Sequence, residues 1–345
     1  MTTRRAAIQQ RGGESIPGPR DFVYITPRGR RISEYEALTL YVQPLEADSP
    51  TPRAMRSTWP EDNTLLRCGD WFNFRDPAQM WSRSYVARQA EQERSLERAS
   101  ETARAAGFYA RIDDDWAALL GDVYVTAGYF EKGLSWALDY AQMNAPADVI
   151  GVAGAFQSID KQRHAEDILF HHYDLRAAGL PVGDDGRRSA WLEDSQFQPM
   201  RELVERIIAT RDWAEIIITV NLVVEPLLGR YLFNEVLLRQ GAVHGDMTTG
   251  PILLEAESDR ERNLDWTVDL VELLLTDEVH GGDNRGVLST WLEQWTPRVD
   301  VVLESLRPVA LRAGADHDAA VAAVRDGQAT LLERSGLIAS AEVAP

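Results

Sequence analysis

Long stretches without proline or glycine are the feature that most constrains this fold, and residues 78–106 form the clearest of them. Asp76 and Pro77 precede this stretch as a helix cap and a first helical residue, and Gly107 follows it as a helix stop. No segment of useful length shows the polar and apolar alternation that is typical of a strand. The sequence therefore predicts an all-α fold. Its other helices are expected over residues 117–144, 148–178, 198–240 with an interruption at Pro226, 250–275, 288–311 with a break near Pro297, and 319–335.

The first 60 residues have a different character, because seven prolines interrupt them and only residues 33–42 are a candidate for a helix. The same stretch holds more aromatic residues than a purely solvated tail needs: Phe22, Tyr24, Tyr35, Tyr41 and Trp59. We predict an extended non-helical N-terminal arm over residues 1–60, a helical domain over 61–312, and a C-terminal helix with a tail over 313–345. The arm is expected either to pack on its own domain or to lie across a partner chain, and the second arrangement is favoured.

The composition excludes several classes of protein. A net charge of −18 at pH 7 is contrary to the basic surface that a general nucleic-acid binder needs. The single cysteine, Cys68, rules out an internal disulfide and a cysteine-based metal site, and it is expected to be a partly buried structural thiol. The first 20 residues lack the apolar segment of a secretory signal, and no stretch approaches the roughly 20 apolar residues of a membrane helix. A cytoplasmic protein with no membrane contact is expected.

Carboxylates and histidines on long helices raise the question of a metal site in a helix bundle. A ferritin-like di-iron site takes one glutamate from each of two helices and a Glu-x-x-His pair from each of two others. The spacing of three places both side chains of such a pair on one face of the helix. No Glu-x-x-His occurs in this sequence, so the chain lacks a complete di-iron site of this kind.

Two segments nevertheless have the outline Asp-Glu-x-Arg-His with substitutions. Residues 160–164 read Asp-Lys-Gln-Arg-His, with Lys161 in place of the glutamate. Residues 259–263 read Asp-Arg-Glu-Arg-Asn, with Arg260 in place of the glutamate and Asn263 in place of the histidine.

A single glutamate in an otherwise apolar or small-residue helix precedes each of these segments. Glu131 lies 30 residues before Lys161, and Glu225 lies 35 residues before Arg260. Both gaps suit a helix, a turn and an antiparallel return. Two such patterns favour a degenerate four-helix site over four unrelated charges. In such a bundle Glu131 is expected to face Lys161, and Glu225 to face Arg260, because unpaired buried charges are costly.

Several short sequence motifs in this chain are informative when they are taken in combination. They are Phe-Arg-Asp-Pro at 74–77, Tyr-Val-x-x-Gln at 85–89 with Glu-Gln-Glu at 91–93, Asp-Trp-x-Glu at 212–215, Asn-Leu-Val-Val-Glu-Pro-Leu at 221–227, and Ser-Glu-Tyr-Glu at 33–36. In combination they resemble the hydroxylase β subunits of the soluble bacterial di-iron monooxygenases, the group of the methane, toluene, phenol, propane and alkene monooxygenases. With the order of elements, the resemblance covers about residues 20–310.

In that family the α subunit holds the di-iron centre, whereas the β subunit shares the helical fold and has lost the ligands. The resemblance therefore implies a ferritin-like long-helix bundle without a complete di-iron site, no cofactor in this chain, and no catalytic residue. The implied partners are an obligate α subunit, a γ subunit, a coupling protein and a reductase, in an NADH-dependent complex that oxidises small hydrocarbons with O₂. Glu131, His164 and Glu225 fill ligand-like positions, and Lys161, Arg260 and Asn263 do not.

One helix face leaves two further functions open. Asp160, His164, Asp167 and His171 recur at i, i+4, i+7 and i+11. Two histidines and a carboxylate could bind one metal ion in a self-sufficient oxidase. The face could instead meet a partner chain, with His172 continuing the contact, and this is favoured. A helical adaptor without an oxygenase is a third hypothesis. Aromatic side chains often anchor large interfaces, and the aromatic candidates are Tyr35, Tyr41, Trp59, Trp71 and Trp81.

Overall fold

The computed structural model describes residues 33–36, 63–183 and 188–338, and this part of the chain is helical, with no strand in it. The predicted all-α class is therefore confirmed. Five long elements form the bundle: α3 (Ser82–Ala105), α5 (Val125–Asn144), α6 (Asp148–Ala177), the π-helical η6 (Val220–Leu238) and α11 (Thr249–Leu275).

Shorter elements connect and cover these five. Those before η6 are η3 (Trp71–Asn73), η4 (Tyr109–Arg111), α4 (Asp114–Leu119), the π-turn η5 (Leu120–Tyr124), α7 (Arg188–Glu193), α8 (Gln198–Ala209) and α9 (Trp213–Thr219). Those after it are α10 (Arg239–Gly241), η7 (Ala242–His244), α12 (Gly281–Ser305), α13 (Arg307–Ala313) and α14 (His317–Arg334).

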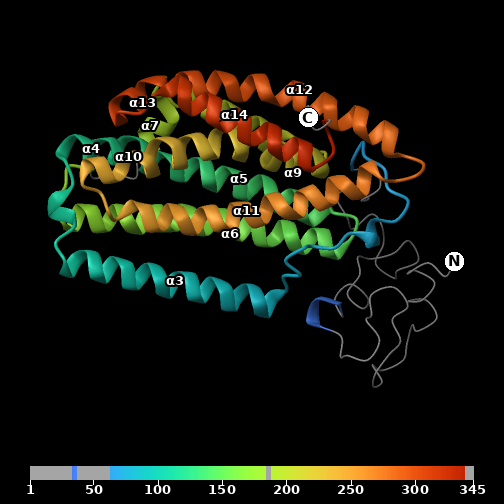
Figure 1. Cartoon of the computed structure of the whole chain (residues 1–345), viewed down its shortest axis with the longest axis horizontal. Coiled ribbons are helices and arrows are strands. Elements are labelled where there is room, and N and C mark those ends of the chain that lie inside the picture. Colours follow the sequence, from blue (N-terminus) through green and yellow to red (C-terminus); the bar gives the residue numbers. More distant parts are fainter. Residues whose placement is uncertain (1–32, 37–62, 184–187, 339–345) are drawn as a thin grey trace, which may run out of the picture.

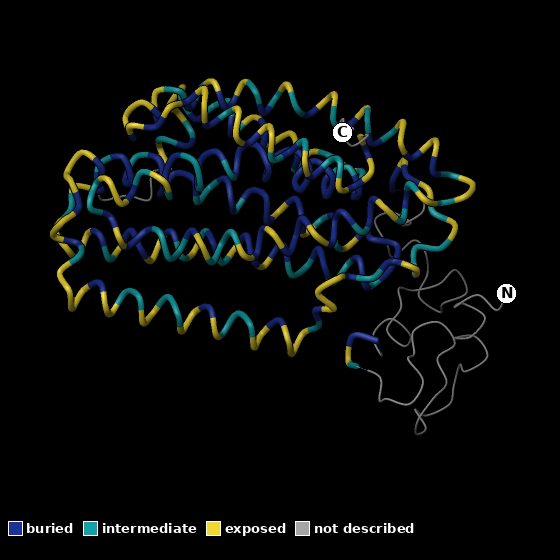
Figure 2. The backbone as a smooth tube through the Cα atoms, viewed as in Figure 1, coloured by how far each residue is buried: buried dark blue, intermediate teal, exposed yellow. Residues whose placement is uncertain are grey.

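The long helices lie side by side in layers (Figure 1). α6 and α11 form a middle layer, with α3 on one side and α5 with η6 on the other. α12 and α14 pack over η6 and close the far side of the bundle. η6 and most of α5 are buried, whereas α3, α6, α11 and α12 have both buried and exposed residues along their length (Figure 2). The inward faces of α5, α6, η6 and α11 therefore form the buried centre of the bundle.

The first long helix begins later than the sequence predicts. Asp76 does not cap it: its carboxylate accepts hydrogen bonds from the backbone N–H groups of Ala78 (2.9 Å) and Met80 (3.0 Å). This closes a turn in which Gln79 has a φ of 47°, which no α-helix allows, so α3 starts only at Ser82. Its end agrees with the prediction, because Gly107 follows with a left-handed φ of 67°.

Neither proline breaks its helix where the sequence predicts a break. Pro226 lies inside η6, where the wider π-turns leave room beside the carbonyl oxygen that a proline ring meets in an α-helix. The interruption lies instead between α8 and α9, where Asp212 caps the new helix. Pro297 lies inside α12, because buried Trp295 and Val299 hold the helix on the bundle on both sides of it.

One helix is apolar and long enough to span a membrane, contrary to the expectation that no stretch comes close. It runs over Trp213–His244, and 94% of its most apolar stretch is buried inside the bundle. It is therefore the core helix of this fold.

Only Ser33–Glu36 of the predicted arm lies among the described residues. Tyr35 is buried in its own chain, and its hydroxyl accepts a hydrogen bond from the backbone N–H of Asp76 at 2.6 Å. A contact of Tyr35 with a partner chain stays a prediction. Tyr41 and Trp59 lie outside the described residues. The division of the chain at residues 60 and 312 stays a prediction.

Candidate functional site

Six side chains at the ligand-like positions meet in the middle of the bundle. They come from four helices, and each is 4% exposed or less: Glu131 (α5), Lys161 and His164 (α6), Glu225 (η6), Arg260 and Asn263 (α11). The order along the chain thus brings residues up to 132 positions apart into one layer.

Lys161 is the centre of this layer. Its Nζ lies 3.0 Å from Glu131 Oε2 and 2.6 Å from Glu225 Oε1. Arg260 Nε lies 2.5 Å from the other oxygen of the same carboxylate, Glu225 Oε2. Both expected pairs are present, but they are not separate: the second carboxylate joins the lysine and the arginine into one chain of charges.

Glu257 extends this chain beyond the positions that the sequence pattern indicated. It forms an ion pair with Arg260, and its Oε1 lies 3.1 Å from Arg230 Nε. The Arg260 guanidinium also lies over the ring of Phe233, 5.6 Å from its centroid. Three buried or half-buried carboxylates therefore face three cations. The spacing of three between Glu257 and Arg260 was the available sequence signal for this contact.

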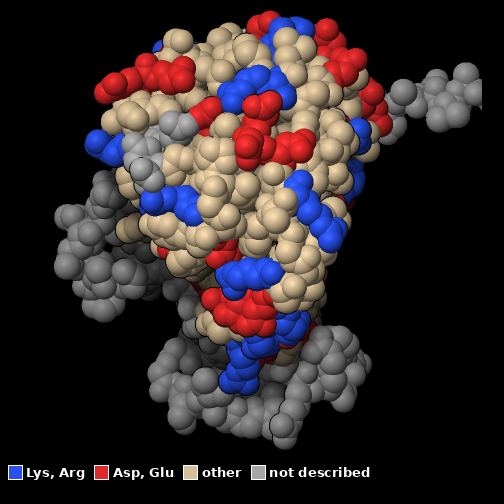
Figure 3. Space-filling view, turned by 90° about the vertical axis from the view of Figure 1, so that its left-hand side faces the viewer, with Lys and Arg blue, Asp and Glu red and all other residues tan. Residues whose placement is uncertain are grey.

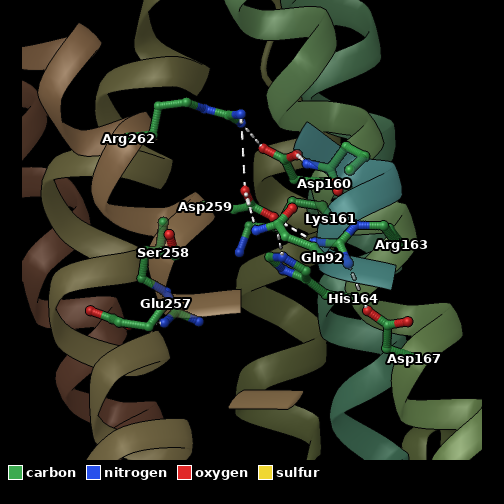
Figure 4. Close-up of polar contacts among 12 residues, drawn as sticks. Gln92, Asp160, Lys161, Arg163, His164, Asp167, Glu257, Ser258, Asp259 and Arg262 are labelled. Carbon is green, nitrogen blue, oxygen red and sulfur yellow. Dashed lines mark hydrogen bonds and ion pairs between the residues drawn. The ribbon is translucent and has the colours of Figure 1, made fainter. Parts of the chain in front are cut away.

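The two degenerate segments also exchange contacts across the bundle (Figure 4). Arg163 of the first segment donates to Asp259 of the second, with Nη2 2.6 Å from Oδ2. Arg262 of the second forms a buried ion pair with Asp160 of the first. Each segment thus supplies the arginine that neutralises the aspartate of the other.

The residues at the histidine positions repeat this exchange. His164 Nε2 lies 3.4 Å from Asp259 Oδ2, and Asn263 Nδ2 donates to Asp160 Oδ2 at 3.1 Å. His164 Nδ1 also faces Glu131 Oε2 at 3.4 Å. His164 thus contacts both an aspartate of the other segment and Glu131. Asn263, whose side chain is shorter, contacts the aspartate Asp160.

The same two aspartates hold α3 against the bundle. Asp160 Oδ1 accepts from the hydroxyl of Tyr85 at 2.9 Å and from Gln89 Nε2 at 3.2 Å. Asp259 Oδ1 lies 3.2 Å from Arg88 Nη2. The two segments therefore connect the charged core to an outer helix.

Electrostatics keep the core charges in their ionised forms. Burial opposes the charge on Glu131, but the Lys161 ammonium and the His164 ring outweigh it and lower the pKa of that carboxyl to about 2. The pKa of Asp259 is also lowered, because His164 and Arg163 overcome its burial. The pKa values of Lys161 and His164 are raised against burial by the neighbouring carboxylates. Asp160 differs: burial and the nearby Asp259 raise the pKa of its carboxyl.

This set of donors does not fit a di-iron centre. An iron site of this type needs oxygen ligands that neutralise the metal charge, and Lys161 and Arg260 place cations at two of those positions. Their charges already neutralise Glu131 and Glu225. Within residues 33–36, 63–183 and 188–338, no group of three or more histidine, cysteine or carboxylate side chains has the arrangement of a metal site. The layer consists of buried ion pairs, and these ion pairs connect the four helices at fixed positions along their axes.

The predicted polar face of α6 contributes His171 and His172 to the interior of the chain, so a contact of these two side chains with a partner stays a prediction. Both are buried by their own chain, at 4% and 1% exposure. His171 Nε2 lies 3.0 Å from Thr248 Oγ1, and burial lowers the pKa of its ring. The helical rise places His171 about 10 Å from His164, so the two rings cannot bind one metal ion. Asp160 and His164 of this face contact α3 and α11, whereas Asp167 and His171 border a groove between α3, α6 and the start of α11.

The remaining interface candidates are partly covered by the chain itself. Trp71 packs edge-on against Trp213, with ring centroids 5.5 Å apart, and Trp81 is half-buried at the start of α3. Cys68 is partly buried as expected, and burial raises the pKa of its thiol to about 11, so the reactive thiolate is disfavoured.

Exposed apolar side chains on α5 and α6 were not found from the sequence. Helical periodicity would have placed them on outward faces, but only the packing shows which faces stay open. They are Trp136, Met143, Ile159, Leu169, Phe170 and Tyr173. Phe170 and Tyr173 border a groove of about 810 Å³ between α3, α6 and the start of α11. Figure 3 shows the end of the molecule at which α3 ends and α4 begins, where acidic and basic side chains lie close to one another between uncharged residues.

Known proteins resemble this chain over most of its length. A family model described as Methane/Phenol/Alkene Hydroxylase matches residues 49–278. The small subunit of the hydroxylase component of propane 2-monooxygenase from Mycolicibacterium smegmatis is 28% identical over 312 residues, which are 86% of this chain and 83% of that protein. The β subunit of the toluene-4-monooxygenase hydroxylase component from Ectopseudomonas mendocina is 25% identical over 302 residues, or 85% of this chain and 90% of that one.

A solved structure agrees with the fold. A chain of toluene 4-monooxygenase, in a structure with toluene bound in the resting active site, has a TM-score of 0.73 and 23% sequence identity. The match covers 86% of this chain and 99% of that chain. The helix order, the degenerate segments and these relatives agree: the chain belongs to the methane/phenol/alkene hydroxylase family, as one of its hydroxylase β subunits.

Proposed function

We propose that this chain is the non-catalytic structural and assembly subunit of the hydroxylase component of an NADH-dependent di-iron monooxygenase. The complex would oxidise small hydrocarbons with O₂, by alkene epoxidation or by alkane or aromatic hydroxylation. The observation that carries the proposal is the Lys161 ammonium between Glu131 and Glu225, which fills the place where this helix arrangement would otherwise hold a metal.

The proposal divides the work between chains. An α subunit would hold the di-iron centre, which supplies the oxygen chemistry when bound. This chain would supply a rigid helical body, since its compensated core charges fix the positions of α5, α6, η6 and α11. A coupling protein, a reductase and a γ subunit are the further partners of the proposal. The cytoplasm is the proposed compartment, in keeping with relatives that are named as hydroxylase components.

The outer surface of α5 and α6 supports a contact with a partner chain. Trp136 and Met143 are 58% and 77% exposed, and exposed aromatic and methionine side chains are typical of interfaces. A Trp136→Asp variant should weaken binding to α while leaving the helical content unchanged. Val279→Asp is the matched control, because Val279 is 80% exposed after α11 at a different place in the chain. Equal effects of the two variants on binding would exclude this surface.

Reconstitution tests the function directly. Purified α subunit, coupling protein and reductase would be assayed for NADH-dependent oxidation of propene or propane, with and without this chain. This chain alone should be inactive, and the mixture should need it for turnover. Full turnover by α without this chain would refute the proposal.

The N-terminal arm is proposed to lie across the partner, although residues 1–32 and 37–62 lie outside the described residues. Deletion of residues 1–60 should lower the association constant with α more than it lowers the stability of the helical body. An unchanged association constant with a full-length partner would rule this out.

A further inference from the structure

One wall of the groove between α3, α6 and the start of α11 is acidic. Glu93, Glu97 and Glu101 recur at intervals of four residues on α3, and all three are exposed and line the groove. Within the described part of the chain, none of these three carboxylates forms an ion pair. Like charges at this spacing repel one another, so a cation bound in the groove would stabilise them.

The groove contains two arginines beside its six carboxylates, and both arginines already have partners. Arg104 pairs with Asp174 at 2.7 Å, and Arg163 pairs with Asp259 at 2.6 Å. The groove therefore keeps an excess of negative charge.

Apolar side chains form much of the remaining lining, and some of them are unusually exposed. Phe170, Tyr173 and Met247 are 64%, 52% and 54% exposed, and Leu96 and Ile252 lie beside them in the groove. A volume of about 810 Å³ is large enough for several side chains of a bound segment. The groove thus suits an occupant that is both apolar and cationic.

A buried histidine in the floor of the groove has one nitrogen left to accept a hydrogen bond. His171 is 4% exposed. The Thr248 hydroxyl donates to Asp246 Oδ1 at 2.8 Å, so it accepts from His171 Nε2 at 3.0 Å. His171 Nδ1 is then an acceptor, and it has no hydrogen-bond partner among the described residues. An N–H donor brought by an occupant would satisfy it.

The first 32 residues of the chain have the complementary composition. They hold seven arginines and only two acidic residues, in a chain with a net charge of −18. An apolar stretch, Phe-Val-Tyr-Ile at 22–25, lies between Arg20 and the arginines at 28, 30 and 31. We propose that residues 20–31 of the same chain bind in this groove when the chain is outside its complex.

The anchor of this segment lies within reach of the groove. Glu34 pairs with Arg83, in the first turn of α3, at 2.9 Å. The helix rises about 24 Å from Arg83 to Ala99 in the groove, whereas the eleven residues from Val23 to Glu34 span up to about 36 Å. The tether also gives the segment a high effective concentration at the groove, so a modest affinity is sufficient.

The inference does not depend on the proposed function, because it concerns the chain by itself. In the complex the arm is proposed to lie across α, so assembly would free the groove. The test needs no α subunit, and its failure would leave the outcome of the reconstitution unaffected.

Disulfide cross-linking of the full-length chain tests the proposal. All variants carry Cys68→Ala, so that only introduced thiols react. Val23→Cys is combined with Ala99→Cys in the groove or, as the control, with Val279→Cys. Val279 is 80% exposed and follows α11 at the end of the bundle where α3 begins, so chance contacts with the arm would favour the control (Figure 1). Mass spectrometry follows disulfide formation in oxidised glutathione.

The pair with Ala99→Cys should form its disulfide within one chain, about 10-fold faster than the control pair. Adding Glu93→Gln and Glu101→Gln should slow this reaction, because the arginines of the segment lose two counter-charges. A concentration of about 0.5 M NaCl should slow it as well, since salt screens exposed charges.

Equal rates for the two pairs would overturn the proposal. A disulfide that joins two chains would identify a second copy as the occupant and would also overturn it, as would a rate that neither salt nor the two glutamine substitutions change. If Ala99→Cys lowers the helical content, Leu96→Cys on the same wall replaces it. A rate no faster than that of the control would then count against the proposal.

Discussion

Two histidines on one face of α6 experience opposite environments. His164 and His171 lie seven residues apart, and both are 4% exposed. Burial disfavours the charge on His164, yet its contacts with Asp259 and Glu131 outweigh burial and raise the pKa of the ring. His171 faces the Thr248 hydroxyl and the ring of Tyr124, and burial prevails, so the pKa of its ring is lowered.

The difference shows what the two ends of the bundle are built from. Around His164, buried charges are solvated by other charges. Around His171, the direct contact is with the neutral Thr248 hydroxyl, and the nearby Asp246 and Asp174 carboxylates do not outweigh the burial of the ring. One helix therefore passes from an ionic core to an ordinary polar core within two turns, and a substitution should have very different consequences in the two regions.

The largest effect is expected at the centre of the ionic region. Lys161→Met should lower the free energy of unfolding by about 3–5 kcal/mol, because two buried carboxylates lose their shared cation. Lys132→Met on α5 should change it by less than about 0.5 kcal/mol. Denaturant titration measures both values. Similar losses for the two lysines would mean that the ionic region is no more sensitive than the surface.

A smaller effect is expected when a charge pair is removed together. Lys161→Met with Glu131→Leu should be about 2 kcal/mol more stable than Lys161→Met alone, since Glu225 keeps Arg260 as its partner. The same denaturant titration gives the coupling energy. A double variant that is simply the sum of the single ones would contradict the shared-cation arrangement.

The two histidines should show opposite dependence on pH. The raised pKa of His164 means that its contribution is fully present below its ordinary pKa of 6.5 and is lost as pH rises through the folded value. The lowered pKa of His171 gives a contribution that is present above 6.5 and is lost as pH falls. His164→Gln should therefore cost most stability at pH 5–6, and His171→Gln should cost most near pH 8. Thermal unfolding across this range checks the two profiles, and parallel profiles would refute the comparison.

The smallest expected effect is a change in the pH at which the Lys161 ammonium loses its proton. Glu131 and Glu225 outweigh burial and raise the pKa of Lys161 above its ordinary value of 10.5. A chain labelled with ¹⁵N at the lysine Nζ should give two signals, because there are only two lysines. The Lys161 signal should remain that of an ammonium at pH 10.5. Half-deprotonation at that pH would show that the carboxylates do not hold the charge.

Sequence patterns predicted which helices carry the buried charged residues better than they predicted which ion pairs these residues form. The spacing of Glu131, Lys161, Glu225 and Arg260 was enough to place them on four facing helices. It could not show that Lys161 reaches both glutamates, because spacing fixes the face of a helix and not its distance from two neighbours. For the same reason the polar face of α6 was assigned to a partner, although His164, His171 and His172 are buried within the chain itself.

Helix boundaries failed where tertiary packing overrides local preference. Pro226 and Pro297 are strong helix breakers in isolation, and both lie inside continuous helices here. The π-geometry of η6 has no simple sequence signal, since it depends on how a fully buried helix fits its neighbours. By contrast, Gly107 marks a helix end as predicted, because its left-handed backbone conformation acts locally.

The exchange of arginines between the two segments has a consequence for folding. Arg163 and Asp259 are 96 residues apart, and Arg262 and Asp160 are 102 apart. Within its own helix Asp259 has only the longer contact with Arg262, at 3.9 Å, so the closer arginine partner of each aspartate arrives only when the two hairpins dock. An intermediate with one hairpin formed therefore gains little by burying its inner face. The bundle should assemble in one cooperative step, with no stable half.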